Sequence, residues 1–110
     1  MNVEILYFDG CPSFEALLPR VREIVTENGG DPDDDITLRA IETVDAAEAA
    51  RFLGSPSVRV DGRDVDPTAG QRDDFGLKCR IYRFEEGQSP TPPDRWIRAA
   101  LSASSGSAKP

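Results

Sequence analysis

Two cysteines, Cys11 and Cys79, are the residues of this 110-residue chain whose side chains could react covalently or bind a soft metal. The chain contains no histidine, which excludes histidine-based catalytic triads, Cys–His nucleophile pairs and histidine-ligated zinc or haem. Two thiolates alone do not make a closed structural zinc site either. We therefore expect no resident metal and no cofactor, and chemistry that depends on a thiol.

Cys11 lies where a predicted strand gives way to a predicted helix. Residues 3–8 (VEILYF) are apolar and β-prone, the next two residues predict a turn, and Pro12 suits the first position of a helix. A helix N-terminus favours the thiolate, which attacks disulfides and binds soft metals. The carboxylates of Asp9 and Glu15 would oppose this effect, so we expect an accessible thiol of modest reactivity. The alternative is a buried cysteine that acts as a small hydrophobic side chain.

Cys79 lies in the alternating segment 77–84 (LKCRIYRF), which predicts one face of a further strand. In one interpretation it is a core residue beside Leu77 and Ile81. In the other, this segment brings Cys79 to Cys11, where it could act as a second, resolving thiol. A disulfide between them requires Cα atoms within roughly 7 Å, and the sequence leaves both interpretations open.

The other segments predict one α/β domain over residues 1–102, followed by a disordered tail over residues 103–110. Asp45 and Glu48 form a capping-box pattern before the second helix. Residues 31–35 predict an acidic loop. Further strands are expected at 36–41, 57–60 and 63–65, and helices at 12–28, 46–53 and from Pro92 onward, with Thr91 as the cap of the last one.

The composition restricts the possible partners. The chain has 13 Lys and Arg against 20 Asp and Glu, a net charge of −7, so nucleic acid and anionic membrane surfaces are poor partners. No apolar run approaches the roughly 20 residues of a membrane span, and the first residues lack the basic region of a secretory signal. We therefore expect a cytoplasmic protein whose partner is a thiol or disulfide, on a small molecule or a protein.

This order of elements resembles the thioredoxin fold, and three local features carry the resemblance. Cys11 begins the first long helix, Pro19 follows eight residues later, and residues 54–58 (GSPSV) precede a hairpin pattern, VRVDGRDV. The resemblance implies a mixed sheet flanked by helices, with an inserted segment before the C-terminal helix. It also implies a cis peptide bond before Pro56, with Ser55 contacting the substrate through its main chain.

More narrowly, the chain is similar to a group of short thioredoxin-family and alkylmercury lyase-like proteins with GCP, GSPxV and CRxY motifs. It departs from thioredoxins at Phe14, which stands where they carry a second cysteine. The resemblance therefore implies thiol–disulfide exchange at Cys11, resolved by Cys79 or by an external thiol. Phe14 is expected either to pack in the core or to form an apolar rim of the site, and Asp9 is the best candidate for an acid or base.

Two other functions stay open. Paired thiolates suit Hg(II) or Cu(I), and organomercurial lyases also use two distant cysteines and an aspartate, for which Cys11, Cys79 and Asp9 are the counterparts. The fold can instead serve as a binding module without turnover, with residues 67–93 as its partner surface. Two thiols close together would favour redox or metal chemistry, and a distant, buried Cys79 would favour single-thiol chemistry or binding.

Overall fold

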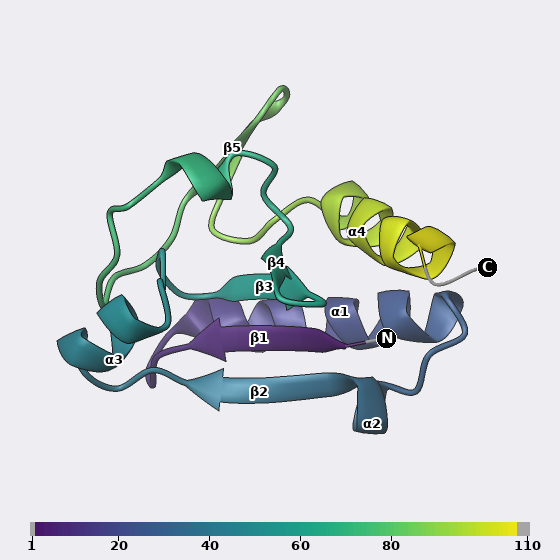
Figure 1. The fold of residues 1–110 in the computed structure, drawn as a ribbon, viewed down its shortest axis with the longest axis horizontal. Coiled ribbons are helices and arrows are strands. Elements are labelled where there is room, and N and C mark those ends of the chain that lie inside the picture. The colour runs from purple at the N-terminus through teal and green to yellow at the C-terminus, as the bar shows by residue number, and fades with distance from the viewer. Residues whose placement is uncertain (1, 108–110) are drawn as a thin grey trace.

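The computed structural model describes residues 2–107, with side chains through Ala103 (Figure 1). Its main sheet is mixed, with strand order β2–β1–β3–β4: β1 is parallel to β2 and antiparallel to β3, and β3 is antiparallel to β4. A separate hairpin joins β5 and β6. The strands are β1 (Val3–Tyr7), β2 (Ile36–Ala40), β3 (Ser57–Val60), β4 (Arg63–Asp64), β5 (Tyr82–Phe84) and β6 (Gly87–Ser89).

The helices cover the two faces of this sheet unequally. Two long helices pack on one face, and a short one packs on the other face at the end where β1 finishes. None of the described helices is long and apolar enough to cross a membrane. The helices are α1 (Pro12–Glu27), α2 (Pro32–Asp35), α3 (Val44–Ala49) and α4 (Asp94–Ser107), with a 3₁₀ turn, η1 (Ala69–Gln71).

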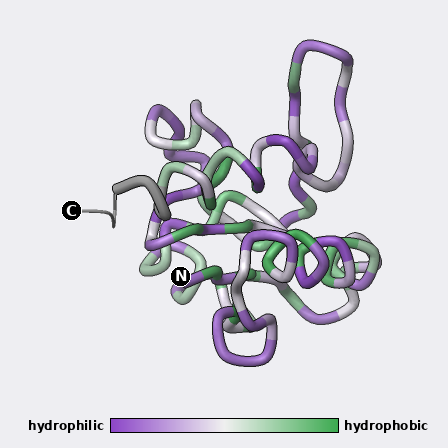
Figure 2. The backbone as a smooth tube through the Cα atoms, turned by 90° about the vertical axis from the view of Figure 1, so that its right-hand side faces the viewer, coloured by the Kyte–Doolittle hydropathy of each residue, from purple (hydrophilic) through white to green (hydrophobic). Residues whose placement is uncertain are grey.

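The main core lies between the sheet and the pair α1 and α4. Alternate residues of a strand face opposite sides of a sheet, so Val3 and Ile5 of β1 pack against α1 and α4. Leu6 faces the other side and packs under α3 with Ala47 and Phe52. Figure 2 shows hydrophobic segments gathered in the middle of the molecule and hydrophilic segments in the outer loops. The predicted α/β class with a mixed sheet is therefore confirmed.

The part of the second sheet face that α3 leaves uncovered is charged. Glu4 lies opposite Arg59 in the β1–β3 register, and Arg59 lies opposite Asp64 in the β3–β4 register. Arg39 lies 3.9 Å from Glu4 on the same face. One sheet face therefore builds the core, and much of the other presents ionic side chains.

Several helix ends differ from the sequence expectation. Thr43, not Asp45, caps α3, since its Oγ1 accepts a hydrogen bond of 3.0 Å from the backbone N–H of Ala46. Helix α4 begins at Asp94, three residues after Thr91, whose Oγ1 accepts a hydrogen bond of 3.0 Å from the guanidinium of Arg20.

The two segments expected to be irregular contain helix. Residues 32–35 of the expected acidic loop form α2. Residues 103–107 of the expected tail belong to α4, and residues 108–110 lie outside the described residues.

The segment 77–84 differs most from the prediction. Only Tyr82–Phe84 forms a strand. The apolar side chains before this strand face outward, since Leu77 is 38% exposed and Ile81 is 44% exposed. Arg80 and Tyr82 are the buried side chains instead. The side chains of this segment do alternate between inside and outside, but the polar ones point inward. Arg80 and Tyr82 can be buried because hydrogen-bond partners are present for them inside the protein.

Gly54 permits the close approach of this segment. Its φ is +127°, and a Cβ at this position would lie 2.9 Å from Cβ of Arg80 and 3.1 Å from the carbonyl oxygen of Lys78. We expect Gly54→Ala to lower the free energy of unfolding by about 3 kcal/mol, because backbone strain and overpacking add. Urea denaturation measures this loss.

Gly29→Ala is the matched control for this prediction. Gly29 also has a positive φ, +81°, but a Cβ there meets nothing within 4 Å. In Gly29→Ala, backbone strain alone should lower the free energy of unfolding by about 1–2 kcal/mol. An equal loss in the two variants would contradict close packing of Arg80 against Gly54.

Candidate functional site

Cys11 lies at the N-cap of α1, in extended backbone conformation, and its side chain makes no capping hydrogen bond. Its backbone N–H donates to the carbonyl oxygen of Phe8 at 3.3 Å. The residue is 4% exposed, so the thiol expected to be accessible is buried. It lines a pocket of about 360 Å³ whose walls are Tyr7, Phe8, Asp9, Gly10, Cys11, Pro12, Phe14 and Glu15.

One wall of this pocket is aromatic. The rings of Tyr7 and Phe14 stack with centroids 4.0 Å apart and planes 5° apart. Phe14 also packs against the main core. It therefore does both things that the sequence offered as alternatives, packing in the core and lining the site. Asp9 is exposed at the same pocket, and the described lining includes no Lys or Arg. The pocket is therefore apolar on one side and acidic on the other.

The loop before β3 lies beside this turn. The Ser55–Pro56 peptide bond is cis, and both residues are buried. The hydroxyl of Ser55 accepts a hydrogen bond of 3.3 Å from the backbone N–H of Phe8. Since the carbonyl oxygen of Phe8 binds the N–H of Cys11, Phe8 connects this loop to the start of α1.

The main chain of Ser55 is fully used within the protein. Its N–H donates to the carbonyl oxygen of Lys78 at 2.8 Å, and its carbonyl oxygen accepts from the N–H of Arg80 at 2.9 Å. These bonds form an isolated parallel bridge between Ser55 and Cys79. The main-chain groups that the resemblance assigned to substrate binding are therefore occupied by the segment that carries Cys79.

The bridge also places the side chain of Cys79. Residues paired across a bridge project to the same side, so Cys79 projects to the side where the Ser55 hydroxyl meets Phe8. Cys79 is exposed, and both cysteines are free thiols. The core interpretation of Cys79 is thus wrong, and the chain brings Cys79 to the loop that contacts the Cys11 turn.

Arg80 and Tyr82 hold this segment against β3. The hydroxyl of Tyr82 donates to the carbonyl oxygen of Pro56 at 2.6 Å, and the guanidinium of Arg80 lies 4.2 Å from the Tyr82 ring centroid. Arg80 also donates to Asp64 at 2.6 Å and to the Ser57 hydroxyl at 3.0 Å. Sequence reasoning missed Arg80, since nothing local marks an arginine whose partners lie 16 and 23 residues away.

The described residues contain no group of three or more Cys, Asp or Glu side chains that could hold a metal ion. The chain matches no known protein-family model, no curated protein and no solved structure.

Tyr82 is expected to contribute stability in a pH-dependent way. Burial raises the pKa of its hydroxyl well above the usual 10.0. The hydroxyl ionises more easily in the unfolded chain, so its contribution is complete below pH 10 and declines as the pH rises further. We expect Tyr82→Phe to lower the free energy of unfolding by about 1–2 kcal/mol at neutral pH. In denaturation measurements above pH 10, this difference from wild type should become smaller.

Tyr7→Phe is the control, because it removes the hydroxyl of the other tyrosine, and that hydroxyl has no hydrogen bond within the described part of the chain. It should leave stability at neutral pH nearly unchanged. A Tyr82→Phe protein as stable as wild type would show that the bond to Pro56 does not hold the segment.

Proposed function

We propose that this protein is a thioredoxin-like thiol–disulfide exchange protein in which Cys11 and Cys79 form one reversible dithiol pair. The observation that carries the proposal is the bridge between Ser55 and Cys79 beside the cis peptide bond. It pairs the segment that carries the exposed thiol of Cys79 with the loop whose Ser55 is hydrogen-bonded to Phe8. The substrate is a disulfide, on a small molecule or on a protein.

The topology supports the thioredoxin-like part of this proposal. A mixed sheet flanked by helices, a long helix that follows β1 and starts after Cys11, and a cis-proline directly before β3 are the features that the resemblance implied. The inserted segment then takes a role that the resemblance did not include. Lys78 and Arg80 pair with Ser55 as the main chain of a bound substrate would, and they present a cysteine in place of the substrate sulfur.

The exposures of the two thiols favour an order of attack opposite to the one expected from the sequence. Cys79 is exposed, whereas Cys11 is 4% exposed and lines a small pocket. A bulky disulfide therefore meets Cys79 first, and Cys11 is suited to the second, intramolecular step. The N-terminus of α1 favours the thiolate that Cys11 needs for that step.

The reaction balances with the substrate as the oxidant. The Cys79 thiolate attacks one sulfur of the substrate disulfide, a mixed disulfide forms, and the other substrate sulfur leaves as a thiolate. The Cys11 thiolate then attacks the sulfur of Cys79 and releases the second substrate thiolate. The substrate gains two electrons, the protein holds a Cys11–Cys79 disulfide, and an external thiol reductant restores the dithiol.

Single-cysteine variants test this order. Purified protein is mixed with 5,5′-dithiobis(2-nitrobenzoate), and the released chromophore and the intact mass are followed. Wild type should end as an intramolecular disulfide without adduct. Cys11→Ser should keep a stable adduct on Cys79, and Cys79→Ser should react at least about tenfold more slowly because its remaining thiol is buried.

Two results would count against the proposal. An adduct on each cysteine of wild type, without an intramolecular disulfide, would show that the pair does not communicate. Equal reaction rates for the two variants would reject the order of attack and leave the pair itself standing. Circular dichroism of each variant establishes that the fold is retained.

A further inference from the structure

A second hollow lies on the charged face of the sheet, between the end of α3, the β3–β4 hairpin and the segment after it. Its volume is about 550 Å³, within the usual range of small-molecule sites. We call it the arginine groove. Its lining residues are Ala50, Arg51, Leu53, Arg59, Gly62, Arg63, Asp64, Asp66, Pro67, Ala69, Gly70, Arg72 and Phe75.

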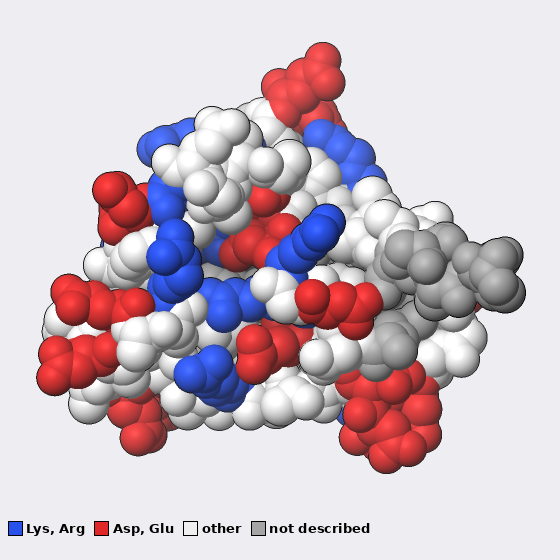
Figure 3. All heavy atoms as spheres, viewed as in Figure 1, with Lys and Arg blue, Asp and Glu red and all other residues white. Residues whose placement is uncertain are grey.

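Three arginines of this groove have no carboxylate partner. Among the described residues, no Asp or Glu forms an ion pair with Arg51, Arg59 or Arg63. This is unusual in a chain with 20 acidic residues and a net charge of −7. Figure 3 shows blue side chains in the middle of this face, with red ones between them.

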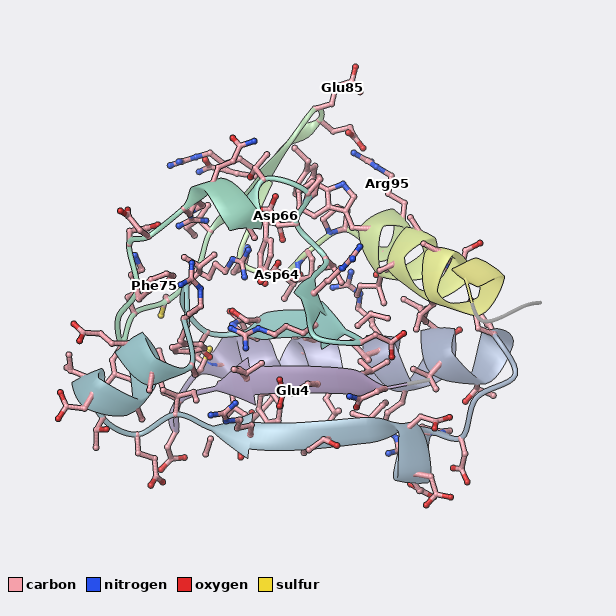
Figure 4. All side chains as sticks on the ribbon, viewed as in Figure 1. Glu4, Asp64, Asp66, Phe75, Glu85 and Arg95 are labelled. Atoms are coloured by element: carbon pink, nitrogen blue, oxygen red, sulfur yellow. The ribbon has the colours of Figure 1, made fainter. Side chains whose placement is uncertain are left out.

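The acidic residues of the groove are already engaged. Asp64 and Asp66 both bind the buried guanidinium of Arg80, and Figure 4 shows these two carboxylates near each other in the middle of this face. The remaining arginine of the lining, Arg72, is paired with Asp74. The uncompensated charge in the groove is therefore positive.

Arg59 shows what this arrangement costs the protein. Its guanidinium donates to the carbonyl oxygens of Ala50 at 2.6 Å and Arg51 at 3.2 Å. Burial lowers its pKa, although Asp64 and Glu4 act in the opposite direction. Asp64 and Glu4 lie opposite Arg59 in the sheet but offset only part of the cost of its burial, and a bound anion would offset more of it.

Arg51 lies beside Phe75, which also lines the groove. Its guanidinium lies 5.0 Å from the centroid of the Phe75 ring, a cation–π arrangement that restricts the side chain and leaves its N–H donors for a ligand. Guanidinium groups form charge-assisted, often bidentate bonds with phosphate and carboxylate. Several arginine donors around one groove suit a ligand with more than one anionic group.

We propose that the arginine groove binds a small molecule that carries two or more phosphate or carboxylate groups. Arg51, Arg59 and Arg63 supply the charge, and Phe75 bounds the site beside Arg51. This proposal is independent of the thiol chemistry, because it uses neither cysteine.

The test is isothermal titration calorimetry at low ionic strength with inorganic pyrophosphate and, separately, with citrate. We expect wild type to bind at least one of them, and Arg51→Gln and Arg63→Gln each to weaken binding about tenfold, as for the loss of one charge-assisted hydrogen bond. Preference for pyrophosphate assigns a phosphate ligand, and preference for citrate assigns a carboxylate ligand.

Arg83→Gln is the matched control. Arg83 is exposed on β5, outside the groove lining, and has no ion pair among the described residues. Arg83→Gln changes the net charge by the same amount as Arg51→Gln and Arg63→Gln. It should leave the affinity for the probes within about twofold of wild type. Failure of wild type to bind either probe would overturn the proposal, and so would equal weakening by Arg83→Gln. Cys11→Ser should bind as wild type does, which separates this result from the test of the thiol pair.

Discussion

The burial of one guanidinium, that of Arg80, is the interaction on which the arrangement of this molecule depends. Its side chain is 0% exposed and donates to Asp64, Asp66 and the hydroxyl of Ser57. A buried charge is tolerated only when it is paired, and loss of one partner of such a pair costs about 3–5 kcal/mol. The segment around Arg80 is therefore fixed against β3 and β4, although most of it is not strand.

This constraint determines where the second thiol lies. Side chains alternate along an extended segment, so burial of Arg80 directs its neighbour Cys79 to the opposite side. The bridge to Ser55 requires Arg80 to approach Gly54 closely. The burial of its neighbour Arg80 and the bridge to Ser55 thus position an exposed cysteine.

Local signals in the sequence were sufficient for the first half of the fold. The apolar run of β1, the Pro12 start of α1 and the Gly-Ser-Pro loop each specify structure within a few residues, and the structure has these elements there. The capping of α3 was misplaced because Thr43 and Asp45 are both good cap residues, and only the backbone shows which one accepts the bond.

The second half could not be predicted in the same way. Alternation in residues 77–84 was interpreted as apolar-inward, the usual rule for a half-buried strand. The rule fails here because Asp64 and Asp66 provide a buried anionic site that only an arginine on the other side of the alternation can fill. That information lies in a pairing between distant residues, which composition and periodicity do not contain.

The same pairing links the two proposed sites. Without Arg80, Asp64 and Asp66 would be free to pair with two of the three unpaired arginines that line the groove with them, and only one uncompensated positive charge would remain for a ligand. With Arg80 in place, those two carboxylates are engaged and the groove keeps its cations. Because Arg80 follows Cys79 directly in the chain, the residue that sets the charge of one site also sets the position of the thiol in the other.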